Sequence, residues 1–135
     1  VDYVFISNIR RYEQLENKNG VELIATSNVT VAKDALFKIN YIDLLIETPG
    51  VSDNSGLMVI KLLKNLKVNS IKLAGYDGYS YDAYKNYADK DLTLVKKKTI
   101  VDSLNEGMVK TLIDFSKQID IEFVTPTRYA NLEVN

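Results

Sequence analysis

The sequence predicts an α/β fold, a three-layer sandwich on a mainly parallel sheet of about five strands. Two observations predict this class. Short apolar or β-branched segments alternate with segments whose apolar residues recur every three or four positions. The strand-like segments are also separated by enough chain for crossover connections, which favour parallel pairing. Ligands of such folds bind beyond the carboxyl ends of strands, so the residues that follow each strand are candidates for a site.

The first half of the chain predicts three strands and a short helix. Val4, Phe5 and Ile6 form an apolar run that stops at Ser7-Asn8, as a buried strand stops before a helix N-cap. The next elements are a short helix over 9–18, a second strand over 21–26 and a half-exposed strand over 34–40, in which apolar and polar residues alternate. The segment 41–47 is ambiguous between a helical turn and irregular chain.

The second half predicts two longer helices and two strands. A mostly buried helix is expected over 57–66, a strand over 71–75, a loop over 76–91, a helix over 99–118, a last strand over 119–125 and a turn over 127–131. Gly107 interrupts the longest helix at a cost of about 1 kcal/mol relative to Ala. Either packing is close at that position or the helix is weak.

Composition excludes several classes of function. The 135 residues include no Cys and no His, which removes disulfides, thiolate and imidazole metal sites, and every catalytic pair built on histidine. Lys plus Arg is 17 and Asp plus Glu is 18, a net charge of −1 that does not favour duplex nucleic acid as a partner. The apolar runs are too short to span a membrane. We expect a cytoplasmic location, no resident cofactor and no metal.

We expect one domain over residues 1–135, since the chain has no repeat, linker or low-complexity tract. It begins at Val1, already within a strand-like segment, which indicates a piece excised from a longer polypeptide.

Candidate ligand-binding residues follow the predicted strands or begin the buried helix. Two strands end in the same dipeptide, Ser-Asn, and Asn-Ser-Gly opens the helix, where free N–H groups and the helix dipole favour an anion. The candidates are Ser7, Asn8, Ser27, Asn28, Asn54, Ser55, Gly56, Asp77, Gly78 and Thr125. The alternative for each is structural, namely an ordinary helix cap or a tight turn. No catalytic residue is assigned.

Two further segments have two interpretations each. The loop after the fourth strand holds five of the nine tyrosines, Tyr76 to Tyr87, and is either a lid over a base or sugar or a surface for a partner. Lys96-Lys97-Lys98 is a solvated stretch before a helix or, less simply, a phosphate contact.

The segments Asp53–Met58 and Ile71–Ser80 resemble a known family. They are similar to the C-terminal domain of bacterial proteins whose N-terminal part is a 4-hydroxy-2-oxovalerate aldolase-like (HMG-CoA lyase-like) barrel, often associated with surface-polysaccharide gene clusters. The resemblance runs over essentially the whole chain. It implies a C-terminal Rossmann-like domain whose partner is the aldolase barrel of the same polypeptide, with the carbon–carbon lyase chemistry in that barrel.

A more distant similarity is to bacterial sialyltransferases and a related pterin pyrophosphokinase-like family. It implies that Ser55-Gly56 lies against the nucleotide of a CMP-sugar and that a strand ending in Gly-x-Asp, here Gly75-Tyr76-Asp77, follows in the chain. Those enzymes use a histidine base, and the corresponding neighbourhood here, Asp102-Ser103, has none.

Three hypotheses follow. The first is an accessory domain of an aldolase that recognises a nucleotide, sugar-nucleotide or sugar acid. The second is a glycosyltransferase-like enzyme domain with Asp77 or Asp102 as base, which would require burial to raise the pKa of Asp102. The third is an oligomerisation or interdomain packing module in which Tyr76 to Tyr87 pack on the barrel or on a second copy of the chain.

Overall fold

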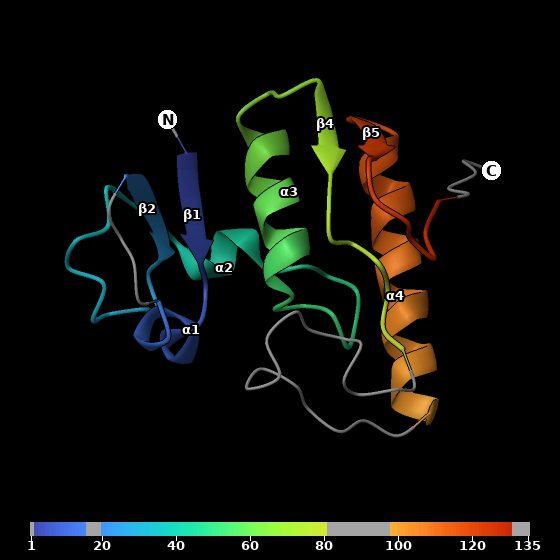
Figure 1. The fold of residues 1–135 in the computed structure, drawn as a ribbon, viewed down its shortest axis with the longest axis horizontal. Coiled ribbons are helices and arrows are strands. Elements are labelled where there is room, and N and C mark those ends of the chain that lie inside the picture. The colour runs from blue at the N-terminus through green and yellow to red at the C-terminus, as the bar shows by residue number, and fades with distance from the viewer. Residues whose placement is uncertain (1, 16–19, 81–97, 131–135) are drawn as a thin grey trace.

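Strands and helices alternate along the computed structural model, which describes residues 2–15, 20–80 and 98–130 (Figure 1). In chain order the elements are β1 (Asp2–Ile6), α1 (Ile9–Glu13), β2 (Val21–Thr26), β3 (Phe37–Ile39), α2 (Tyr41–Leu44), α3 (Ser55–Asn65), β4 (Ser70–Leu73), α4 (Lys98–Ser116) and β5 (Asp120–Phe123). The predicted order of elements is confirmed within these ranges.

The described strands form two parallel sheets. One has the order β1-β2-β3, with Asp2 opposite Val21 and Ile24 opposite Phe37. The other pairs β4 with β5 from Ser70 opposite Asp120 onward. The α/β class, the parallel pairing and five strands are thus confirmed, whereas the described strands form two sheets rather than one.

Side chains pack on both faces of the three-stranded sheet. Ile6, Leu23 and Ala25 point to one face, where they form a buried cluster with Val29, Ala32 and the partly buried Tyr12 and Leu15. The residues between them in sequence point to the other face, because side chains alternate along a strand. There Phe5, Ile24 and Ile39 pack against a cluster of Leu44, Met58 and Leu62.

The two-stranded sheet has one apolar face. Ile71 and Leu73 of β4 pack with Ile121 and Phe123 of β5 against the cluster that includes α3 and α4. The alternate residues of both strands, Ser70, Lys72, Asp120 and Glu122, are polar and exposed. Lys72 and Glu122 are cross-strand partners, and Nζ of Lys72 lies 3.8 Å from Oε2 of Glu122. Within the described residues this half has two layers, because the outward positions of its strands carry polar side chains. This differs from the predicted three layers.

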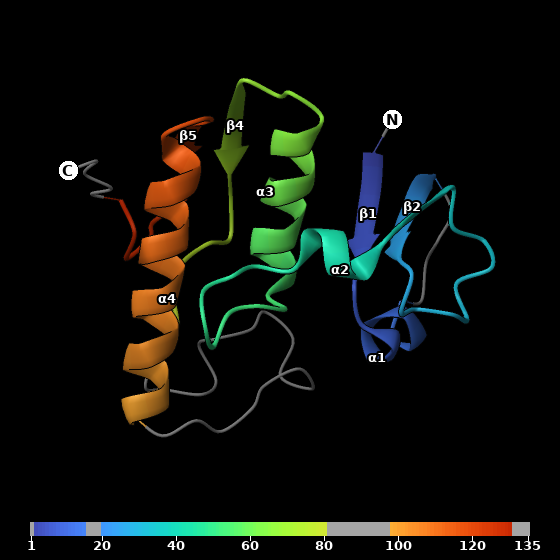
Figure 2. The ribbon, with the colours of Figure 1, turned by 180° about the vertical axis from the view of Figure 1, so that it is seen from behind.

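Helix α3 joins the two halves. Its neighbouring residues Leu57 and Met58 are both fully buried, but Leu57 belongs to the cluster around β4, β5 and α4 and Met58 to the cluster beneath β1, β2 and β3. Opposite views show α3 between β1 and β4 (Figures 1 and 2). The predicted buried character of this helix is confirmed.

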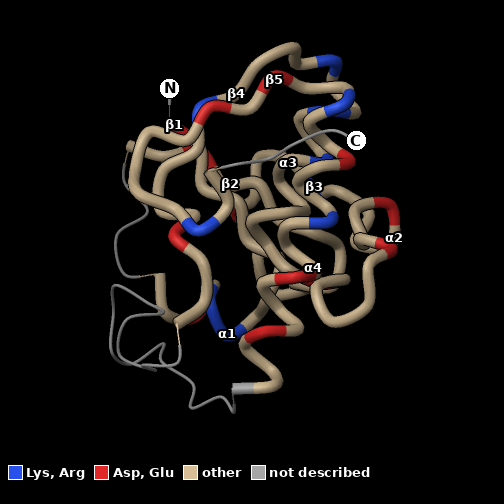
Figure 3. Tube along the Cα trace, turned by 90° about the vertical axis from the view of Figure 1, so that its right-hand side faces the viewer, with Lys and Arg blue, Asp and Glu red and all other residues tan. Residues whose placement is uncertain are grey.

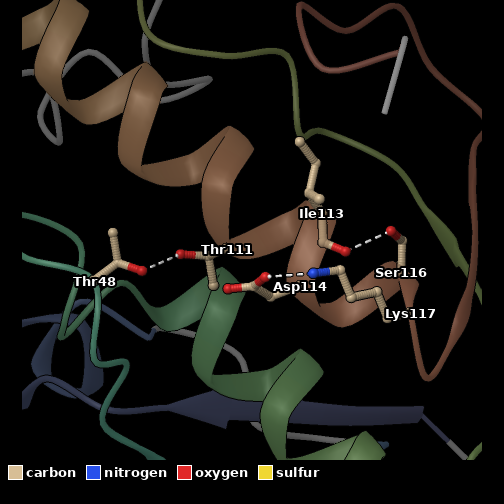
Figure 4. A network of polar contacts seen from close by, with 6 residues as sticks. All are labelled: Thr48, Thr111, Ile113, Asp114, Ser116 and Lys117. Atoms are coloured by element: carbon tan, nitrogen blue, oxygen red, sulfur yellow. Dashed lines mark hydrogen bonds and ion pairs between the residues drawn. The ribbon is translucent and has the colours of Figure 1, made fainter. Parts of the chain in front are cut away.

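Helix α4 packs closely at its glycine. A Cβ on Gly107 would lie 3.2 Å and 3.3 Å from the two Cγ atoms of Val51, so close packing explains this glycine. One turn later, the buried Thr111 hydroxyl lies 2.8 Å from both the Thr48 hydroxyl and the carbonyl of Gly107 (Figure 4 shows the pair of threonines). The helix is therefore tied to the 48–51 segment by both packing and hydrogen bonding.

Several boundaries differ from the sequence prediction. Helix α1 ends at Glu13, short of 18, and β3 covers Phe37–Ile39 rather than 34–40. The chain before β3 instead makes a turn in which the Ala35 N–H bonds to the Ala32 carbonyl. The segment 41–47 begins with one helical turn, α2. Tyr81, Tyr84, Tyr87, Lys96 and Lys97 lie outside the described residues.

Candidate functional site

A cavity of about 630 Å³ lies at the carboxyl end of β1 and is also lined by residues of α1 and of the first turn of α3. Its lining includes both apolar and polar side chains from segments between residues 5 and 104. The lining residues are Phe5, Ile6, Ser7, Asn8, Arg11, Asn28, Tyr41, Gly50, Asp53, Asn54, Ser55, Gly56, Tyr79 and Leu104.

Three of the four residues of the two strand-end dipeptides, Ser7, Asn8 and Asn28, line this cavity. The buried Ser7 hydroxyl hydrogen-bonds to the Ser55 hydroxyl, which links the end of β1 to the start of α3. The Asn28 amide donates to the Ser7 carbonyl over 2.9 Å. Asn8 caps α1, since its side-chain oxygen accepts from the Arg10 N–H at 2.8 Å. These contacts hold two polar strand ends against a helix start.

The first turn of α3 forms the adjoining wall. Asn54 is its N-cap, and its side-chain oxygen accepts from the Leu57 N–H at 3.0 Å. The predicted cap is therefore confirmed. The N–H groups of Ser55 and Gly56 begin the helix, where the dipole makes the potential positive. This wall can accommodate negative charge.

Tyr76 packs against Gly56, in the first turn of α3. Its hydroxyl donates to the Gly56 carbonyl over 2.9 Å, and a Cβ on Gly56 would lie 3.0 Å from its ring. Burial raises the pKa of Tyr76 to about 12. Gly56 is thus needed for this close approach, and Tyr76 is a neutral hydrogen-bond donor at neutral pH.

Tyr79 is attached to both α3 and α4. Its hydroxyl accepts from the Asn54 side-chain amide at 3.3 Å. Its backbone pairs with the side chain of Asn105, which accepts from the Tyr79 N–H and donates to the Tyr79 carbonyl, both at 2.9 Å. The buried Tyr129 hydroxyl donates to the same Asn105 oxygen over 2.7 Å.

Four of the ten sequence candidates lie away from the cavity lining. The Ser27 hydroxyl accepts from the Tyr41 N–H at 3.0 Å, at the start of α2. The other three are near the ends of β4 and β5: Thr125 accepts from the Gly75 N–H at 2.9 Å, and the Asp77 carbonyl accepts from the Arg128 N–H at 3.0 Å. Gly78 lies against the Arg128 side chain. Turn formation accounts for these residues.

Six of the sequence candidates lie in the cavity lining, and Tyr79 belongs to the tyrosine-rich segment that the sequence offered as a lid. The other seven described lining residues were missed. Among the missed ones Arg11 supplies a cation, which also donates to Gln14, and Asp53 supplies a carboxylate. Asp53 directly precedes the Asn-Ser-Gly motif, so its position in the sequence could have indicated a place in the lining. Arg11 and Tyr41 had no such signal, because only the tertiary fold brings them here.

The proposed bases are not in this cavity. Asp77 and Asp102 are both exposed, and neither belongs to the lining. Asp102 therefore lacks the burial that the enzyme hypothesis requires of it.

Figure 3 shows positively and negatively charged residues at scattered positions along the described part of the chain. In residues 2–15, 20–80 and 98–130, no three carboxylates are grouped as a metal ion would require. None of the described helices combines the length and apolar character needed to cross a bilayer.

Comparison with known proteins gave no relative. The chain matches no family model, no curated protein and no solved structure.

Proposed function

We propose that this chain is a ligand-binding accessory domain that recognises a nucleotide, sugar-nucleotide or sugar acid in the cavity at the end of β1. The observation that carries the proposal is the meeting of polar residues from two strand ends with those of a helix start in one cavity: Ser7, Asn8, Asn28, Asn54, Ser55 and Gly56.

The chemistry of the lining fits this ligand class. The α3 amides and the Arg11 guanidinium favour a phosphate or carboxylate, and Asp53 is suited to accept from sugar hydroxyls. The serine hydroxyls and asparagine amides offer both donors and acceptors. A volume of about 630 Å³ falls within the usual range for small-molecule sites.

The order of the strands supports a Rossmann-like interpretation. Placing the inner edges of the two sheets side by side gives β3-β2-β1-β4-β5, the order typical of dinucleotide-binding folds. The cavity then lies near the point where the order reverses, between β1 and β4. Ligands of open α/β sheets bind at that point.

The wider proposal rests on the family resemblance. The domain belongs to a bacterial, cytoplasmic protein with an aldolase-like barrel, which acts in surface-polysaccharide biosynthesis and carries the carbon–carbon lyase chemistry. In this proposal, this chain recognises the ligand and the barrel carries out the reaction.

Calorimetric titration of the chain with CMP-sugars, UDP-sugars and a free sialic acid tests the proposal. We expect one of these ligands to bind, and Ser55→Ala to weaken it about tenfold, because a hydrogen-bonding hydroxyl at the anion wall is lost. Ser70→Ala, on the exposed face of β4, is the matched control and should leave the affinity unchanged. Absence of binding across the whole panel would refute the proposal.

A further inference from the structure

Asn105 fixes the backbone of Tyr79 in an unusual manner for a side chain. It satisfies both the N–H and the C=O of that residue, each at 2.9 Å, as a neighbouring strand would. The half-buried Asn105 is itself held, since its oxygen also accepts from Tyr129. Asn105 of α4 therefore holds the backbone of Tyr79 through one side-chain amide.

Among the described residues, the aromatic side chains in the cavity lining are Tyr79, Phe5 and Tyr41. Phe5 belongs to β1 and Tyr41 begins α2, whereas Tyr79 lies in the segment after β4. Its hydroxyl contacts Asn54, the cap of α3, so the ring lies beside the wall proposed to hold the anion. An aromatic ring next to an anion site can stack on the base of a nucleotide whose phosphate occupies that site.

We propose that Tyr79 forms the base-stacking wall of the cavity and that Asn105 is the positioning residue that holds it there. This inference rests on the proposed function and narrows its ligand class to nucleotides. Stacking requires only a π face, so the site accepts more than one base. The sugar and phosphate are bound independently, by the α3 turn and the strand ends.

The test compares three probes: UMP, AMP and ribose 5-phosphate, which lacks a base. The wild-type chain should bind both nucleotides at least tenfold more tightly than ribose 5-phosphate. Tyr79→Ala should abolish this difference between nucleotides and ribose 5-phosphate, and Tyr79→Phe, which keeps the ring, should retain it. The exposed Tyr3→Ala is the matched control and should behave as wild type.

Asn105 is tested by a graded pair of variants. Asn105→Asp keeps the acceptor for Tyr79 and Tyr129 but loses the donor, and Asn105→Ala loses both. The nucleotide affinity should therefore fall in the order wild type, Asp, Ala, by about tenfold in total, with ribose 5-phosphate unaffected. Asn65→Ala, at the exposed end of α3, is the control. Circular dichroism checks folding, and if Asn105→Ala does not fold, Asn105→Asp and the Tyr79 series still decide the question.

The outcomes separate this inference from the proposed function. Equal affinity for nucleotides and ribose 5-phosphate in the wild type, or a nucleotide preference that survives Tyr79→Ala, overturns the stacking role alone. A preference unchanged in both Asn105 variants overturns the positioning role. No binding of any probe to the wild type overturns this inference, and if the CMP-sugars, UDP-sugars and sialic acid also fail, the proposed function falls with it.

Discussion

Gly78 has a φ of +99°, and a Cβ there would lie 2.7 Å from Cδ of Arg128. Gly75 has a φ of +79° in the same segment but open space around it. Gly75→Ala should therefore cost about 1 kcal/mol from backbone strain alone, and Gly78→Ala about 2–3 kcal/mol, because side-chain crowding is added. Urea denaturation of the two variants measures the difference. Equal losses would mean that Arg128 moves aside at no cost.

A partly buried tyrosine, Tyr76, and a buried one, Tyr129, predict a loss of stability at alkaline pH. Burial raises the pKa of Tyr76 to about 12, and burial, together with the neighbouring Tyr79, raises that of Tyr129 to about 12. An unfolded tyrosine ionises near pH 10, so the stabilisation is fully present below about pH 10 and is lost as the pH rises to about 12. The urea midpoint should fall across this window. The double variant Tyr76→Phe/Tyr129→Phe should show a shallower fall, and an identical fall would contradict the assignment.

At the scale of residues, sequence reasoning succeeded where local chemistry decides. Asn8 and Asn54 were predicted as helix caps, because a short polar side chain before an apolar helical run has few other uses. The sequence distinguishes less well between polar residues that face a cavity and polar residues that close a turn. Asp77, Gly78 and Thr125 have the composition of a ligand loop. Asp77 and Gly78 contact Arg128 and Thr125 contacts Gly75, and these contacts depend on the pairing between β4 and β5.

The contact between α4 and the 48–51 segment predicts coupling between Gly107 and Val51. Gly107→Ala improves helix propensity by about 1 kcal/mol but forces a methyl group to within 3.2 Å of Val51. We expect no net gain in stability, since overpacking costs about 1–3 kcal/mol. In the Val51→Ala background the same change should stabilise. A double-mutant cycle by chemical denaturation measures this, and additivity of the two changes would show that the contact is relaxed in solution.

At the scale of elements, α3 and α4 were predictable because apolar residues at spacings of three or four over many residues have one stable arrangement. Short elements were less so. The alternation over 34–40 is typical of a strand, but only Phe37–Ile39 pairs with β2. Strand pairing is a long-range property, so the ends of such a short strand are set by its neighbour.

The division of α3 between two clusters predicts that the molecule unfolds as one unit. Leu57→Ala removes contacts on the β4–β5 side and Met58→Ala on the β1–β2–β3 side, each at about 2–5 kcal/mol. Because α3 contributes to both clusters, either substitution should lower the hydrogen-exchange protection of both β2 and β5. Leu66→Ala, at an exposed position, is the control. Loss of protection confined to the nearer sheet would show that the halves unfold separately.

At the scale of the whole molecule, the class and strand direction followed from the alternation of elements. The separation into two sheets did not, because it depends on which strand edges hydrogen-bond. The polar outward face of β4 and β5 could have been predicted, because polar residues alternate with apolar neighbours in both strands: Ser70, Lys72, Asp120 and Glu122. Such alternation indicates a sheet with one solvated face.

The lining of the cavity is drawn from residue 5 to residue 104, from both sides of α3. A molecule bound there therefore engages only the folded chain, and binding acts on the folding equilibrium as a whole. At a concentration of about one hundred times its Kd, a ligand adds about 2.7 kcal/mol to stability. For a domain of this size that corresponds to roughly 10 °C in the melting temperature. Thermal melting against a library of metabolites would thus let the protein itself select its ligand, with no assay for any reaction.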